Sequence, residues 1–133
     1  MITKKLFIFL LVVFYSLTKN ITYAYAETAL LLYANDKKFL GCINCNKYDK
    51  YSIWNEYGDY GSKYIASSIW NQYAKYGGKY SLYSPFNPYS HIPPRIVDQR
   101  GNFYGYLTAN RYHAQRANNT KLIVTILSIG SKQ

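Results

Sequence analysis

KYDKYSIWNEYGDYGS (residues 47–62) is followed by KYIASSIWNQYAKYGG (63–78) and a shortened KYSLYSPFNPYS (79–90), so one pattern returns every sixteen residues. Self-similarity at a fixed period is the signature of a repeat architecture, in which each unit buries its apolar face against its neighbours. The large apolar positions of the units predict the core of this region: Ile53, Trp54, Ile69, Trp70 and Phe86.

The third unit suggests how each repeat is shaped. Ser84 is followed by Pro85, and a serine before a proline is typical of a helix start. By analogy, Ser52 and Ser68 predict short helical turns; Gly58 is placed to end the first, whereas the second unit has Ala74 there. An all-strand repeat is the alternative, because Tyr, Trp and Ile favour strands. The conserved spacing of Asn55, Asn71 and Asn87 predicts side chains that bond the local backbone.

The flanking segments favour strands. Residues 28–33 and 38–43 surround a polar turn at 34–37, and residues 95–98 and 102–108 surround a second turn. The two hairpins resemble each other when Asp36 is aligned with Asp98, with the second one residue longer at its turn.

The C-terminal part completes the expected fold. Residues 109–121 are polar and predict a loop or short helix, whereas the apolar, β-branched run at 122–129 predicts a buried strand. The sequence therefore predicts a small α+β fold: two β-hairpins and a C-terminal strand packed with short helical turns from the aromatic repeat.

The N-terminal 26 residues have the pattern of a secretory signal peptide. Lys4 and Lys5 precede ten apolar residues, and small residues at Ala24 and Ala26 fit a cleavage site. The apolar run is too short to span a membrane as a helix, so no stable anchor is expected after cleavage. We expect one domain at residues 27–133, exported to the periplasm or the medium.

Two cysteines, Cys42 and Cys45, lie close together in the expected exported part. In an oxidising compartment such a pair predicts a structural disulfide, stabilising by about 2 kcal/mol because its loop is short. The alternatives are a thiol–disulfide exchange site and half of a metal site. No βαβ pattern surrounds the pair, and the histidines lack ligand spacing, so no metal or cofactor is expected.

The chain is basic, with 16 lysines and arginines against six acidic residues. Removing residues 1–26 leaves 13 against six, a net charge of +7. Such a balance favours an anionic envelope polymer, a glycan, acidic lipid head groups or an acidic protein as partner, and the alternative is that the charge only provides solubility. The basic residues are scattered, which gives no nucleic-acid footprint.

Residues 48–89 contain ten tyrosines, two tryptophans and one phenylalanine, interleaved with lysine. Tyrosine combines a flat apolar face with a polar edge, which suits stacking on sugar rings and protein interfaces. The sequence therefore predicts a non-catalytic binding surface, with these candidate residues: Tyr57, Tyr60, Tyr64, Tyr73, Tyr76, Tyr80, Lys63 and Lys79.

A small exported enzyme is the competing interpretation, with His91 or His113 as the base of a hydrolase. No nucleophile motif frames either histidine, and no phosphate-binding loop is present. Asp36 and Asp98 fall at expected turns, where aspartate commonly bonds its own backbone.

Three motifs together resemble a family of small, mostly uncharacterised bacterial proteins: FLGCINC at 39–45, the tandem SIWNxYGxYGS-type repeat, and the closing hairpin with IVD and FYGYLT. The resemblance covers roughly residues 38–110 and leaves out the segment 122–129. It implies no established activity, cofactor or catalytic residue.

Overall fold

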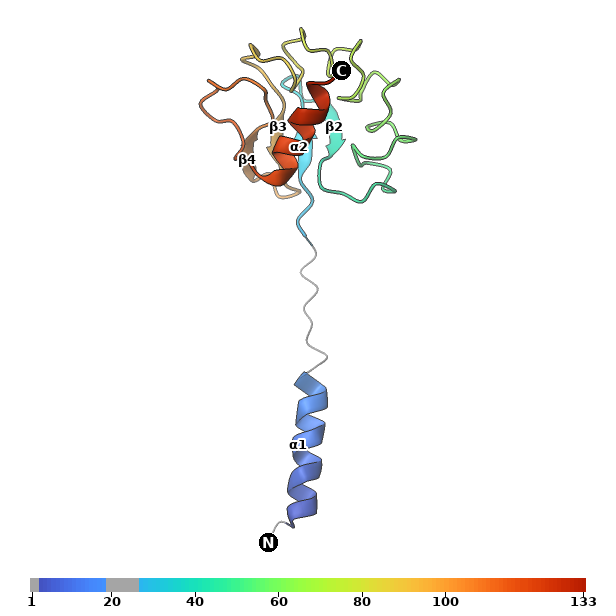
Figure 1. Ribbon diagram of the computed structural model, residues 1–133, viewed down its shortest axis with the longest axis vertical. Helices are drawn as coiled ribbons and strands as arrows, with labels where there is room; N and C mark the ends of the chain where they lie inside the picture. Colours follow the sequence, from blue (N-terminus) through green and yellow to red (C-terminus); the bar gives the residue numbers. More distant parts are fainter. Residues whose placement is uncertain (1–2, 19–26) are drawn as a thin grey trace.

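The computed structural model describes residues 3–18 and 27–133 (Figure 1). Helix α1 spans Lys4–Thr18, within the expected signal peptide. The expected cleavage site at 24–26 lies outside the described residues. Among the helices of the described residues, none has the length and apolarity to cross a membrane.

A four-stranded antiparallel sheet forms the centre of the fold, in the order β2-β1-β3-β4. Both predicted hairpins are confirmed, and the fold belongs to the α+β class. The strands are short, as expected for segments bounded by turn residues: β1 (Leu31–Tyr33), β2 (Phe39–Cys42), β3 (Arg95–Val97) and β4 (Phe103–Tyr106).

The C-terminal run is a helix, so the strand predicted at 122–129 is wrong. Helix α2 spans Lys121–Gly130 and begins at Thr120, whose hydroxyl accepts the N–H of Ile123. Ile123, Ile126 and Gly130 are buried, which is the spacing of one helix face. Packing of that face outweighs the strand preference of the β-branched residues. α2 lies in front of the sheet and inside the arc of the repeats (Figure 1).

The repeat region contains consecutive β-turns, so the short helical turns predicted there are also wrong. The N–H of Asp49 donates to the carbonyl of Asn46, that of Ser52 to Asp49, and that of Asn55 to Ser52. Each turn begins at the residue that closes the previous one, giving a step of three residues. Bonds from i to i−4 occur at Ser62 and Gly78, where the extra glycine lengthens one turn, but they are isolated and do not continue into an α-helix.

A three-residue pattern in the sequence explains these turns. Asn, Asp or Ser opens a turn, and its side-chain oxygen accepts the N–H of the residue two positions later, which is usually aromatic. Asn46 accepts from Tyr48, Ser52 from Trp54. The same arrangement recurs at these openers: Asp49, Asn55, Ser62, Ser68, Asn71, Ser81, Ser84 and Asn87.

Five triplets and one extra residue make the sixteen-residue unit, and the extra residue is Gly61 in the first unit and Gly77 in the second. Asparagine amides tie the turns together, as predicted. Asn55, Asn71 and Asn87 each donate to the carbonyl of the residue six positions earlier. The repeat thus satisfies its backbone locally and forms an arc around the sheet (Figure 1).

The core lies between the sheet, the arc and α2. Leu32, Leu40 and Ile96 of the sheet belong to one buried cluster with Ile126 of α2. The predicted repeat core residues join it: Ile53, Ile69, Trp70 and Phe86 are buried, and Trp54 packs against them half-buried.

The structure also contains an internal duplication, because residues 30–53 and 94–117 make the same backbone bonds 64 positions apart. The N–H of Ala34 donates to the carbonyl of Lys38, and in the same way the N–H of Asp98 donates to the carbonyl of Asn102. The N–H and carbonyl of Cys42 bond the segment 51–53, and those of Tyr106 bond the segment 115–117. The two hairpins are therefore equal in length, and the extra residue predicted in the second turn is wrong.

Leu32 pairs with Ile96, which is its own counterpart in the duplication. A pseudo-twofold axis therefore passes between β1 and β3. Each outer strand is bridged by the turn segment that follows it, through Cys42 with Ser52 and Tyr106 with Arg116. These bridges cover part of both sheet edges, which would otherwise be open to pairing with another chain.

Candidate functional site

A stack of aromatic rings runs beneath the repeat surface and fixes the position of each unit. Trp70 lies between Trp54 and Phe86, with ring centroids 5.6 and 5.7 Å apart. The indole N–H of Trp54 donates to the carbonyl of Ile43, and that of Trp70 to the carbonyl of Ile53. Residues sixteen positions apart are thereby held one above the next.

Two grooves lie at neighbouring units and share matching residues, and Trp54 and Trp70 of the stack line the first of them. Groove A, of about 590 Å³, is lined by Tyr57, Lys63 and Tyr64. Groove B, of about 480 Å³, is lined by Tyr73, Lys79 and Tyr80, the same three positions one unit later. Gln133 lines both, so the grooves are neighbours at the C-terminal end of α2. These volumes fall within the range of small-molecule sites.

The tyrosines of both grooves present their rings to solvent. Tyr57 is 97% exposed and Tyr73 is 91% exposed. Their backbone N–H groups are held by Asn55 and Asn71, so the direction of each side chain is set by a turn. Four of the six predicted tyrosines and both predicted lysines therefore line the grooves.

Each groove pairs an ammonium group with an exposed ring. The Nζ of Lys63 lies 5.3 Å from the ring centroid of Tyr64, and that of Lys79 lies 5.4 Å from that of Tyr80. A ring face beside a cation offers stacking and charge at one place. Groove A also contains Glu56, where groove B has Gln72, so groove B has the more positive lining.

Tyr60 and Tyr76 were predicted as binding residues, but they do not line the grooves. Tyr60 packs on Phe39 with ring centroids 4.9 Å apart, and burial raises the pKa of its hydroxyl. The hydroxyl of Tyr76 donates to Asp36 at 2.8 Å, which ties the first hairpin to the second repeat. We assign both residues a structural role.

Three further tyrosines are exposed in the same way, and the sequence prediction left them out. Tyr48 and Tyr89 belong to the sixteen-residue series of the groove tyrosines. Tyr112 is 96% exposed and corresponds to Tyr48 through the duplication. The sixteen-residue step alone could have identified the first two.

The histidines and cysteines considered for catalysis do not come together in one site. His91 is exposed. The Nδ1 of His113 accepts the N–H of Gln115, and its ring lies 4.7 Å from that of Tyr106. Cys42 and Cys45 form a disulfide, as predicted, and Cys42 is fully buried in β2. Within residues 3–18 and 27–133, no cluster of His, Cys, Asp and Glu forms a metal site.

The two turn aspartates hold their hairpins. Hydrogen bonds, the largest from the Asn102 side-chain amide, outweigh the opposing desolvation and lower the pKa of Asp98 below its ordinary value. Its carboxylate also accepts the Arg100 N–H and the Tyr104 hydroxyl. For Asp36, desolvation raises the pKa, but hydrogen bonds from Lys75 and Tyr76 outweigh it and leave the pKa lowered.

These bonds predict an acid-sensitive hairpin. A carboxyl whose pKa is lower in the folded protein stabilises above its ordinary pKa, near 4, and that stabilisation is lost as pH falls through the folded pKa. The Asp98→Asn variant is therefore expected to be less stable than the wild type at pH 7 and to differ less from it at about pH 2.5. Urea unfolding at both pH values measures this. The Asp59→Asn variant, which makes the same change at an exposed position, is the control. Equal pH dependence in wild type and Asp98→Asn would contradict the assignment.

No family model, no curated protein and no solved structure matches this chain. The family resemblance of residues 38–110 stays a prediction.

Proposed function

We propose that the protein is an exported, non-catalytic binding protein that holds an extended anionic polysaccharide along grooves A and B. The observation that carries the proposal is the repetition of one groove, with the same two tyrosines and one lysine, at neighbouring units. A polymer with a repeating sugar unit presents the same chemistry to both grooves. Two linked weak contacts then give a combined affinity well above either one.

A polysaccharide fits this surface better than a protein partner. A protein-docking patch is expected to be flat, with an aromatic anchor at its centre. Here Trp54 and Trp70 line the inside of groove A, half-buried and buried respectively, so neither projects as the central anchor of a flat patch. The exposed groups are tyrosine rings and lysine ammonium groups, which suit sugar faces and carboxylates or phosphates respectively.

Export is part of the same proposal. The signal-peptide pattern at residues 1–26 supports it, and the disulfide fits an oxidising compartment. Envelope and extracellular polysaccharides would be the polymers within reach of such a protein.

Retention of the purified protein on insoluble polymers tests the proposal. The wild type is expected to bind a uronic-acid polysaccharide or peptidoglycan at about 0.15 M salt, and not to bind neutral dextran or phospholipid vesicles. The Tyr64→Ala/Tyr80→Ala variant removes one ring from each groove and is expected to bind at least about tenfold more weakly.

The matched control is Tyr112→Ala, which removes an equally exposed tyrosine outside both grooves. Its retention is expected to equal that of the wild type. Loss of all binding at 0.15 M salt would show that the charge acts only non-specifically, and an equal loss in the control would exclude the grooves as the site.

A further inference from the structure

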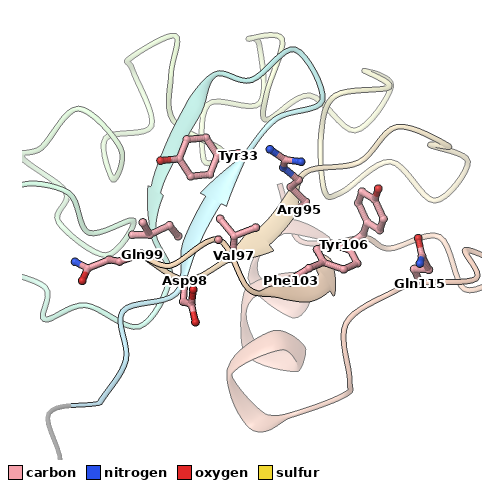
Figure 2. Close-up of a pocket in the computed structure, with 10 residues that line it drawn as sticks. Tyr33, Arg95, Val97, Asp98, Gln99, Phe103, Tyr106 and Gln115 are labelled. Atoms are coloured by element: carbon pink, nitrogen blue, oxygen red, sulfur yellow. The ribbon is translucent and has the colours of Figure 1, made fainter.

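A third pocket, of about 570 Å³, lies on the outer face of the sheet, away from the core (Figure 2). Alternate residues of β1 and β3 form its floor together with Phe103 and Tyr106 of β4, and the turn after β3 and Gln115 border it. It shares no lining residue with groove A or groove B.

The strand register arranges the pocket as two rows. Arg95 pairs with Tyr33 on one side and Tyr106 on the other, so a guanidinium group stands between two phenol side chains. The adjacent row is apolar, because Val97 pairs with Leu31 and Phe103. Figure 2 shows Tyr33, Arg95 and Tyr106 in sequence across the strands, with Val97 and Phe103 beside them.

The internal duplication explains why this pocket exists: the matching position in the first hairpin is filled by aromatic side chains. In the first hairpin, Phe39 is enclosed by the rings of Tyr33, Tyr51 and Tyr60, with centroids 5.2, 6.1 and 4.9 Å away. Phe103 is the counterpart of Phe39 and is 46% exposed.

The covering side chains have been replaced in the second hairpin. Val97 stands where the first hairpin has Tyr33, and Gln115 where it has Tyr51. Arg95 stands where the first hairpin has Leu31. The second hairpin has thus lost these two rings and gained a cation. Its Tyr106, which stands where the first hairpin has Cys42, packs on one side of Phe103 with ring centroids 5.1 Å apart.

The charge of Arg95 is available to a ligand. Its side chain is exposed, and among the described residues the only ion pair is between Lys75 and Asp36. Asp98 also borders the pocket, but its carboxylate oxygens already accept bonds from Asn102, Arg100 and Tyr104.

We propose that this pocket binds a small organic anion, in which a carboxylate is attached to an aromatic or other apolar ring. The carboxylate takes the guanidinium fork of Arg95, which matches it in shape and charge. The ring lies on the row of Leu31, Val97 and Phe103, in the place that the missing tyrosine rings would fill. This site is independent of the polysaccharide grooves.

A titration of the purified ¹⁵N-labelled protein with benzoate, followed by NMR, tests the site. Saturable shifts are expected for amides of β1, β3 and β4. The Arg95→Gln variant is expected to bind benzoate at least about tenfold more weakly, since it loses a charge-assisted pair at an exposed position where the fold does not depend on it. Benzamide, which has the same shape and no charge, is expected to bind wild type and Arg95→Gln equally weakly.

Two variants complete the test. Arg100→Gln removes an exposed cation just outside the pocket and is expected to bind benzoate like the wild type. Val97→Tyr/Gln115→Tyr restores the rings of the first hairpin and is expected to abolish binding while the amide spectrum of the core is retained. Absence of saturable shifts, equal binding by Arg95→Gln, or shifts confined to grooves A and B would each overturn the proposal.

Discussion

The Trp70→Ala variant is expected to lose about 4 kcal/mol of unfolding free energy. Trp70 is 8% exposed and stacks between Trp54 and Phe86. Removing the side chain leaves a cavity in the middle of the ring stack, and the carbonyl of Ile53 loses the hydrogen bond that it accepts from the indole N–H. Urea unfolding, followed by near-ultraviolet circular dichroism, measures the loss.

Two companion variants separate the causes of this effect. Trp70→Phe keeps a ring in the stack and loses the indole N–H, so a smaller loss of about 1–2 kcal/mol is expected. Tyr73→Ala removes an exposed ring from the same repeat and is expected to change stability by at most about 0.5 kcal/mol. A loss in Trp70→Ala no larger than in Tyr73→Ala would contradict the account of the core.

The Gly77→Ala variant is expected to lose about 3 kcal/mol or more, which lowers the melting temperature by roughly 10–20 °C. A β-carbon at Gly77 would lie 2.3 Å from the carbonyl oxygen of Asn71 and 2.5 Å from that of Ile69. Both are backbone atoms of the turn ladder, so no side-chain rotation relieves the contact. Thermal unfolding gives the shift directly.

The neighbouring glycine is the natural control. A β-carbon at Gly78 would meet backbone oxygens only at 3.2 Å, and the first repeat has Ser62 at this position. Gly78→Ser is therefore expected to melt within a few degrees of the wild type. If Gly77→Ala has the same melting temperature as Gly78→Ser, Gly77 does not pack tightly against the carbonyl groups of Asn71 and Ile69.

Short-range turn chemistry made the hairpins predictable from the sequence. Asp36 and Asp98 mark their turns, and alternating apolar residues mark the strands. Helix α2 was missed because its β-branched residues favour strands, although Thr120 as a cap and the spacing of Ile123 and Ile126 indicated a helix. Tertiary packing decided between two patterns that the same residues satisfy.

The repeat was found at a period of sixteen, whereas the unit of its local structure is three. A serine before a proline fits the opening of a β-turn as well as a helix start, and Ser84 opens a turn. The recurrence of Asn, Asp or Ser every third residue, each followed two positions later by an aromatic, distinguishes the two interpretations.

The candidate site could be predicted in its residue types and only partly in its members. Every tyrosine of a unit ends a triplet, so the local pattern does not say which rings are exposed. Tyr60 is half-buried because β2 presents Phe39 beside it, and Tyr57 is exposed because nothing covers its turn. The pocket at Arg95 was not predicted, since it depends on comparing two hairpins related by the duplication.

An NMR titration with a uronic-acid hexasaccharide at about 0.15 M salt tests the central claim most directly. The account predicts shifts in both grooves together, at the amides of 57–64 and 73–80, with no shifts on the outer face of the sheet. Shifts located elsewhere, or none at all at millimolar sugar, would contradict the proposal that the repeat is a polysaccharide-binding surface.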